Sequence, residues 1–292
     1  MGLTASLLLR KVVSMSDGRT CARYWLNGID PCQVMFRNGY TPDPWQSEIL
    51  RKRPRRAILC WGRQVGKTRC LSAFALSELF YRPGSLVLIS SYNQKKSKEM
   101  LLKVMELYKP FADEFALAVD TTEEKRLANG SRVIALTGDD DSPRSYTADV
   151  VLLDEAAFTN DGLRASIDAC LAVKNGPLVA MSTPPTHPSG WWYGTWTRNE
   201  TLQPDEAAGP DRGGWFAQQC SDGWYRTMVR STECPRISPA FLEQARLDNG
   251  EENYLREYEC QFPDRGRFSS NRPFAPQKVA AIPRVAMEAF GG

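Results

Sequence analysis

The chain has 292 residues, of which 42% are hydrophobic and 24% charged, a balance typical of folded globular proteins rather than disordered ones. Basic residues (37) barely outnumber acidic residues (34), so the net charge of +3 neither requires nor excludes a nucleic-acid partner. The eight cysteines are scattered and His187 is the only histidine, which argues against a disulfide scaffold, a multi-histidine metal site and a catalytic triad.

The N-terminal sequence MGLTASLLLRKVV contains an apolar run that is too short for a signal-peptide core. No later segment is long and apolar enough to span a membrane. We therefore expect a soluble protein of a reducing cytoplasm, with free thiols and no membrane partner.

From residue 42 onward, short apolar segments alternate with amphipathic ones. The expected strands are Ala57–Trp61, Ser85–Ser90, Asp149–Leu153 and Pro177–Met181. The expected helices are Lys67–Tyr81, Asn93–Tyr108 and Asp161–Val173. Asn129-Gly130 indicates a hairpin between Lys125–Ala128 and Ser131–Leu136. This alternation predicts an α/β fold with a mainly parallel sheet flanked by helices.

The composition changes after Pro184, where residues 185–215 are rich in Pro, Gly and Trp and are expected to form a long irregular connection. A short β pair (Trp215–Cys220 and Tyr225–Arg230) and two helices beginning after Ser238 follow. We expect a domain edge near residue 200. The expected parts are an irregular N-terminal segment (1–41), a core (42–200), a lid or linker subdomain (201–262) and a tail (263–292).

The strongest motif is WGRQVGKT, Trp61–Thr68, which lies between an expected strand and an expected helix. It resembles a P-loop, whose backbone N–H groups face phosphates, although Trp61 stands where the first glycine is usual. Lys67 would reach the β and γ phosphates, and the Thr68 hydroxyl would hold Mg²⁺. The alternative is an ordinary helix start with an exposed lysine. The expected ATP-binding residues of the loop are Gly62, Arg63, Gln64, Val65, Gly66, Lys67 and Thr68.

Downstream, VVLLDEAA (Val150–Ala157) has the Walker B pattern of an apolar strand followed by two acids. Asp154 would lie near the Mg²⁺ shell, and Glu155 would polarise the attacking water as a general base. The alternative is a buried strand that ends in two solvated acids. A P-loop upstream in the same chain favours the catalytic interpretation.

Two other short segments have both a functional and a structural interpretation. Ser182 and Thr183 end a strand, where their hydroxyls would sense the γ-phosphate or simply close the strand before a proline. Gln46, in PDPWQSEIL, would bind adenine through its amide, or would belong to a helix start that packs Trp45 into the core.

In this order, PDPWQ, RQVGKT, LLDEAA and STP resemble the large terminase subunit of tailed phages, from about Gly39 to Phe268. The resemblance implies a RecA-like ATPase domain with a small C-terminal lid. It also implies that Gln46 contacts adenine, that Arg63 handles phosphate, and that Ser182 and Thr183 couple hydrolysis to motion. Arg144 would act on the nucleotide of a neighbouring subunit, or would pair with the acidic run at 139–141.

The resemblance further implies Mg²⁺-dependent ATP hydrolysis that moves double-stranded DNA into a procapsid in the bacterial cytoplasm. The implied partners are DNA, bound without sequence preference, a portal protein, a small terminase subunit and further copies in a ring. The family's nuclease domain would begin near Phe268. Only Glu288 is acidic in the 24 residues that follow, so we expect no DNA cleavage. The alternatives are a nuclease-less prophage remnant that binds nucleotide and a helicase-like nucleic-acid ATPase.

Two clusters are possible DNA contacts. A basic run would touch phosphates or form a solvated loop, and the loop is the favoured interpretation. An aromatic cluster would stack on bases or pack a lid against the core, and packing is favoured. The run comprises Arg51, Lys52, Arg53, Arg55 and Arg56, and the cluster comprises Trp191, Trp192, Tyr193 and Trp196.

Overall fold

The computed structural model describes residue 28 and residues 30–136, 142–198 and 215–262. The expectations for most of the N-terminal segment, for the acidic run at 139–141 and for the tail at 263–292 lie outside these ranges. Among the residues that are described, no helix combines the length and the apolar character needed to cross a membrane.

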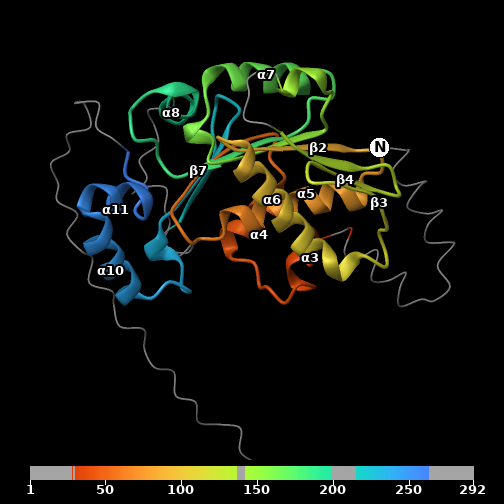
Figure 1. The fold of residues 1–292 in the computed structure, drawn as a ribbon. Coiled ribbons are helices and arrows are strands. Elements are labelled where there is room, and N and C mark those ends of the chain that lie inside the picture. Colours follow the sequence, from red (N-terminus) through yellow and green to blue (C-terminus); the bar gives the residue numbers. More distant parts are fainter. Residues whose placement is uncertain (1–27, 29, 137–141, 199–214, 263–292) are drawn as a thin grey trace, which may run out of the picture.

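A single sheet with the strand order β3-β4-β5-β2-β6-β7-β1-β9-β8 forms the centre of the fold (Figure 1). The strands from β5 across to β9 are parallel, and the pairs β3–β4, β4–β5 and β8–β9 are antiparallel. The strands are β1 (Arg56–Trp61), β2 (Leu86–Ser90), β3 (Leu117–Asp120), β4 (Glu124–Leu127), β5 (Arg132–Ala135), β6 (Val150–Asp154), β7 (Leu178–Ser182), β8 (Phe216–Gln219) and β9 (Tyr225–Val229). The mainly parallel α/β sheet expected from the sequence is confirmed.

Helices cover both faces of this sheet (Figure 1). One face carries α3 (Gln33–Phe36), α4 (Pro44–Lys52), α5 (Lys67–Tyr81) and α6 (Gln94–Tyr108), and the other carries α7 (Asp161–Leu171) and α8 (Gly190–Thr197). The helices α10 (Pro239–Asn249) and α11 (Glu251–Glu257) lie to one side. Short 3-10 turns are η1 (Lys109–Phe111), η2 (Ser142–Ser145), η3 (Ala156–Phe158) and η5 (Ser231–Glu233).

β1 shows how the sequence produces this sandwich. Ala57, Leu59 and Trp61 pack into the core beneath α4 and α5, whereas Ile58 and Cys60 pack into the core beneath α7 and α8. Successive side chains of a strand point to opposite faces, so a strand covered on both faces is apolar at every position. The same arrangement buries all of β2 and β7.

The expected irregular connection at 185–215 is corrected by α8, which occupies Gly190–Thr197. Trp192 and Trp196, one helical turn apart, are buried and stack at a centroid distance of 5.7 Å. Burial of these rings on the sheet outweighs the low helix propensity of a Gly- and Trp-rich segment. For Trp192 and Trp196 the structure therefore shows packing, which was the favoured interpretation of the aromatic cluster.

The expected domain edge near residue 200 does not separate two folding units. β9 pairs in parallel with β1, with Ala57 opposite Tyr225, so the β8–β9 hairpin extends the central sheet. Among the described residues, the segment 231–258, which contains η5, α10 and α11, has a small core of its own made of Leu242, Ala245, Tyr254 and Tyr258. We call the segment 231–258 the lid from here on. A hairpin needs a third strand to be stable, and the edge of β1 supplies it.

Candidate active site

The loop Gly62–Gly66 joins the end of β1 to the first turn of α5 at the carboxyl edge of the sheet. Gly66 has a φ of 87° and precedes the helix, and Gln64 has a φ of 64°. A side chain on Gly66 would strike the amide of Gln46. The loop therefore requires glycine at this position for both its conformation and its close packing.

The first half of the loop is held by the lid. A Cβ on Gly62 would lie 2.6 Å from Oγ of Ser231 and 2.8 Å from the carbonyl oxygen of Tyr258. The backbone N–H of Arg63 donates to the carbonyl of Glu257 at 2.9 Å, and Oγ of Ser231 donates to the carbonyl of Arg63 at 2.7 Å. The lid and the loop are thus joined through main-chain atoms, so neither can shift far without the other.

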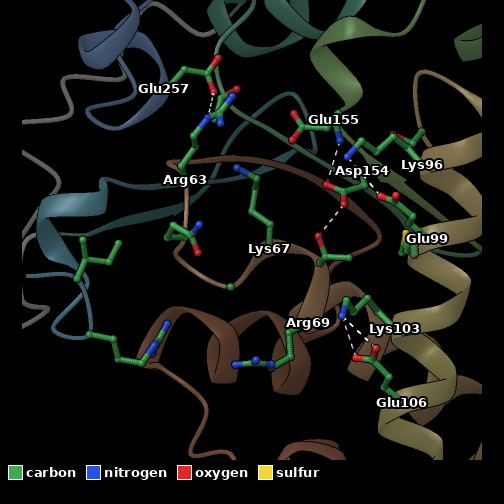
Figure 2. Close-up of a pocket in the computed structure, with 18 of the residues that line it drawn as sticks. Arg63, Lys67, Arg69, Lys96, Glu99, Lys103, Glu106, Asp154, Glu155 and Glu257 are labelled. Carbon is green, nitrogen blue, oxygen red and sulfur yellow. Dashed lines mark hydrogen bonds and ion pairs between the residues drawn. The ribbon is translucent and has the colours of Figure 1, made fainter. Parts of the chain in front are cut away.

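Lys67 extends from the start of α5 back over the loop (Figure 2). Its ammonium group donates to the carbonyls of Trp61 at 3.0 Å and Gly62 at 3.1 Å. In this position the positive charge of Lys67 lies over the loop. An anion seated on the loop would meet it.

Thr68 and Asp154 join the two motifs. Oγ1 of Thr68 donates to Oδ2 of Asp154 at 2.9 Å, although the residues come from α5 and β6 (Figure 2). The N–H of Glu155 donates to the other carboxylate oxygen of Asp154 at 3.0 Å. Burial raises the pKa of Asp154, and the positive charge of Lys67 works in the opposite direction.

Glu155 follows the strand in a left-handed conformation, with a φ of 53°, and its side chain faces Lys67 across the cleft (Figure 2). Burial is the main cause that raises the pKa of this carboxyl, and Lys67 is the main opposing influence. Oγ of Ser182 donates to Oε2 of Glu155 at 3.4 Å. A non-glycine residue in this conformation is uncommon outside turns and strained functional sites.

Arg63 and Glu257 form an ion pair at the top of the cleft, with 2.8 Å between Nε and Oε2 (Figure 2). The hydrogen bond from Arg63 to Glu257 raises the pKa of the guanidinium. Arg63 is 58% exposed at its side chain, so this pair contributes little to stability, and its charge remains available to the cleft.

Gln46 lies beneath the loop rather than on the wall of the cleft. It is 2% exposed, its Oε1 accepts the N–H of Asp43 at 2.9 Å, and its Nε2 donates to the carbonyl of Gly66 at 3.1 Å. Trp45 is also buried, and its indole donates to the carbonyl of Val65 at 3.2 Å. The structural interpretation of PDPWQ therefore fits the geometry, and the expected contact of Gln46 with adenine stays a prediction.

One open cleft of about 1330 Å³ is lined by Arg63, Lys67, Thr68, Asp154 and Glu155, among others. The loop and the start of α5 form its floor, the ends of β2 and β6 form its rear, and α6 and the lid form its sides. The α6 side carries two lysine–glutamate pairs, Lys96–Glu99 at 3.3 Å and Lys103–Glu106 at 3.0 Å (Figure 2). Thr183, 1% exposed, reaches the cleft from the end of β7.

A family model described as the N-terminal part of the T4likevirus-type terminase large subunit matches residues 58–275. The chain belongs to the terminase large subunit family. Among curated proteins, the large terminase subunit of Thermus virus P23-45 is 29% identical over 175 residues, which cover 53% of this chain and 36% of that protein. The chain thus spans about a third of the length of the curated relatives that it matches.

Solved terminases share the fold. The ATPase domain of the Thermus phage P74-26 large terminase superposes with a TM-score of 0.65 at 22% identity, covering 80% of this chain and 97% of that domain. The large terminase of bacteriophage HK97 superposes with a TM-score of 0.59 at 15% identity, covering 80% of this chain and 55% of that one. The RecA-like fold of terminase ATPase domains is therefore the fold of this chain.

Arg144 lies away from the cleft of its own chain. Its Nε donates to Oγ of the buried Ser166 at 3.0 Å, which ties the η2 turn to α7. The alternative pairing with the acids at 139–141 lies outside the described residues. The expected action of Arg144 on another subunit stays a prediction.

The basic run extends from the last turn of α4 to the start of β1, at the end of that strand opposite the phosphate loop. Arg51 pairs with Asp30 at 2.9 Å, Arg53 pairs with the buried carboxylate of Glu78, and Arg56 donates to the carbonyl of Gly176 at 2.7 Å. These pairings favour a structural role for the run. The seven described cysteines are all free and buried.

Sequence reasoning missed the lid residues at the cleft, Ser231, Arg236 and Glu257. No spacing rule links them to the loop, because they follow it by more than 160 positions (168 for Arg63 to Ser231). These residues lie inside the range of the family resemblance, Gly39 to Phe268, which covered the segment without giving any of them a role.

Proposed function

We propose that this chain is the ATPase of a phage DNA-packaging motor, which hydrolyses ATP to move double-stranded DNA into a procapsid. The observation that carries the proposal is the hydrogen bond between Thr68 and Asp154, with Lys67 and Glu155 on either side of it. A large terminase of a thermophilic bacteriophage with a similar fold, with a TM-score of 0.56, is known in complex with ADP.

The phosphate end of ATP would bind over the loop. The ammonium group of Lys67 lies over this space and favours a negatively charged group, whereas the N–H groups of Gly62 and Arg63 donate to the carbonyls of Val229 and Glu257. On binding, the ammonium group would exchange the carbonyls of Trp61 and Gly62 for phosphate oxygens. Arg63 supplies a second cation at the rim, since its side chain is more than half exposed.

The donor set at Thr68 and Asp154 fits Mg²⁺. The hydroxyl and the carboxylate are oxygen donors 2.9 Å apart, and Mg²⁺ in nucleotide sites takes few protein ligands besides phosphate oxygens and water. No cluster of three or more His, Cys, Asp or Glu side chains occurs in the described ranges, so a site built by protein ligands alone is not formed there. When bound, Mg²⁺ neutralises developing charge on the phosphates.

Glu155 would orient and deprotonate the attacking water. Burial raises the pKa of Glu155 and so makes it a stronger base than an ordinary glutamate, and the positive charges of Lys67 and Arg63 act in the opposite direction. The Ser182 hydroxyl, 3.4 Å from Oε2 of Glu155, ties the catalytic carboxylate to the end of β7. Ser182 and Thr183 are then positioned to pass a change at the γ-phosphate to the segment that leads into α8.

The proposed partners follow from family membership. They are double-stranded DNA, bound without sequence preference, a portal protein, a small terminase subunit and further copies of this chain in a ring, all in the bacterial cytoplasm. A prophage remnant that binds nucleotide without packaging is the second candidate. The paired Thr68 and Asp154 and the unreplaced Lys67 and Glu155 favour the working enzyme.

The test compares two variants in the same assays. Lys67→Ala is expected to abolish most ATP binding, because it removes the cation over the loop. Glu155→Gln is expected to retain binding and to reduce turnover by roughly 10²- to 10⁴-fold, the usual contribution of a general base. ATP binding, ATP hydrolysis and DNA protection from nuclease in procapsids are measured for each. Wild-type affinity in Lys67→Ala would refute the assignment of the loop.

A further inference from the structure

The rear of the cleft has polar side chains at the end of β2 as well as at the end of β6. The strand order β2-β6-β7-β1 places the end of β2 beside Asp154, on the side away from the phosphate loop. Ile89 lies opposite Leu152 in the β2–β6 ladder, and both side chains pack into the core beneath α5. Because side chains alternate along a strand, Ser91 and Asp154, two residues further on, lie side by side on that same face. Both residues line the cleft.

Ser91 has a hydroxyl group that makes no hydrogen bond within the described part of the chain. The residue is 1% exposed. Its backbone N–H donates to Oγ of Ser97 at 3.0 Å, and that Oγ donates to the carbonyl of Asn93 at 3.3 Å, so the start of α6 fixes the backbone at Ser91. A buried hydroxyl without a partner costs free energy. An unpaired hydroxyl on the wall of a cleft therefore indicates a ligand atom as its partner.

Lys96 supplies a cation at the same place. Its side chain extends from the first turn of α6 toward Asp154 (Figure 2). Burial is the main cause that raises the pKa of Asp154, and the positive charge of Lys96 is one of the influences that oppose it. The ammonium group pairs with Glu99 at 3.3 Å, but the two side chains are 48% and 51% exposed. Such a pair is weak, so the ammonium group can exchange Glu99 for another anion.

A hydroxyl and an ammonium group together suit the oxygens of a phosphate. When ATP is hydrolysed, Lys67 and the loop remain with the phosphates of ADP, and the freed phosphate is a separate anion. The carboxylates of Asp154 and Glu155 repel this anion, so a cation beyond them is needed to hold it. The cleft continues past Lys96 along α6, on the side opposite the lid, which gives the phosphate a way out.

We propose that Ser91 and Lys96 form a subsite that holds inorganic phosphate after hydrolysis and before it leaves the cleft. This proposal rests on the proposed function. In the reaction, the water oxygen bonds to the γ-phosphorus, and the bond from that phosphorus to the bridging oxygen breaks with its electron pair going to ADP. Glu155 takes one proton of the water and returns it to solvent. Ser91 and Lys96 bind the product of these steps, so the retention of phosphate depends on them and the binding of ADP does not.

The experiment measures the dissociation constant of inorganic phosphate for the full chain saturated with Mg²⁺ and ADP, and the dissociation constant of ADP without added phosphate. Because ADP occupies the loop, the first constant reports on the space beyond its β-phosphate. Ser91→Ala removes the hydroxyl, Lys96→Gln removes the charge, and Lys96→Arg keeps the charge. Lys98→Gln is the matched control, because Lys98 lies on the same helix, pairs with Glu123 at 2.9 Å and is outside the cleft lining.

We expect Ser91→Ala and Lys96→Gln each to weaken phosphate binding roughly tenfold, which is about the effect of losing one hydrogen bond to a charged group. ADP binding should stay unchanged in both variants. Lys96→Arg and Lys98→Gln should retain the phosphate binding of the wild type. Ser91→Ala removes a hydroxyl that bonds to no described residue, so its melting temperature should equal or exceed that of the wild type.

Equal phosphate constants in the wild type, Ser91→Ala and Lys96→Gln would overturn the subsite. Absence of phosphate binding to the wild type with ADP would do the same. A purely structural role for either side chain would weaken ADP and phosphate together, and that result would also contradict the proposal. Failure of the wild type to bind ADP is a different result, which would overturn the proposed function and the subsite with it.

Discussion

Nε of Arg63 lies 2.8 Å from Oε2 of Glu257, and this pair joins the phosphate loop to the end of α11 near Glu155, the proposed general base. The two charges act on Glu155 in opposite directions. Arg63 lowers the pKa of Glu155 and Glu257 raises it, on top of the larger effects of burial and Lys67. The pair therefore affects the pKa of the proposed base, Glu155, and also links the phosphate loop to α11.

The pH profile of ATP hydrolysis tests this tuning. Glu155 accepts a proton only as a carboxylate, so the rate falls as the pH drops through its raised pKa, and the acid limb lies above the range of an ordinary glutamate. Arg63→Gln is expected to move this limb to higher pH, and Glu257→Gln to lower pH. Arg246→Gln, which breaks the exposed pair with Glu251 elsewhere in the lid, serves as the control. Acid limbs that lie at the same pH in all three variants would show that the Arg63–Glu257 pair does not shift the pKa of Glu155.

Removal of either partner of the Thr68–Asp154 bond should weaken the response to Mg²⁺. Asp154→Asn and Thr68→Ala are expected to lower turnover by roughly a hundredfold or more, since metal stabilisation of phosphoryl transfer is worth several kcal/mol. Thr68→Ser keeps the hydroxyl and should retain most activity. The measurement is the ATP hydrolysis rate over a Mg²⁺ titration. Wild-type Mg²⁺ dependence in Asp154→Asn would exclude Asp154 from the metal site.

Arg144 is expected to act on the nucleotide of a neighbouring subunit, because η2 holds it against α7 and away from its own cleft. An arginine supplied in this way is worth roughly 10³- to 10⁵-fold in rate. Arg144→Ala should bind ATP normally but lose the rise in specific activity that accompanies assembly.

A mixing experiment separates action in trans from a structural role. Arg144→Ala and Glu155→Ala are each expected to be inactive, and their mixture is expected to regain turnover where an intact Arg144 faces an intact Glu155. Rings that form from the mixture without any recovered activity would contradict action in trans.

Trp61 replaces a glycine of the usual P-loop pattern, and its role is structural. It is fully buried, and its indole donates to Oγ1 of Thr227 at 2.7 Å, joining β1 to β9. Trp61→Ala should lower the free energy of unfolding by about 3–5 kcal/mol. Trp61→Phe should cost less and leave the Thr227 hydroxyl without this partner. Urea denaturation curves give both values, and Phe36→Ala, at a 41% exposed ring, is the surface control. A loss below about 1 kcal/mol in Trp61→Ala would contradict the packing role.

Local signals in the sequence were sufficient to predict most of the strands and helices of the core. The strand, loop and helix around Lys67 and the strand that ends at Asp154 were predicted to within one or two residues. Apolar periodicity and glycine placement act over a few residues, and parallel strands bring their carboxyl ends to one edge. The meeting of Thr68 with Asp154 follows from those facts alone.

Three features depended on the tertiary structure. β9 lies beside β1 rather than in a separate subdomain, α8 forms from a segment whose composition is that of a loop, and Gln46 turns its amide toward Asp43 and Gly66. Each is decided by contacts between residues far apart in the chain or by burial against the sheet, which local propensity does not encode. For the same reason the sequence did not indicate that Arg236 and Glu257 lie beside the loop, because they reach it only when the lid packs against it.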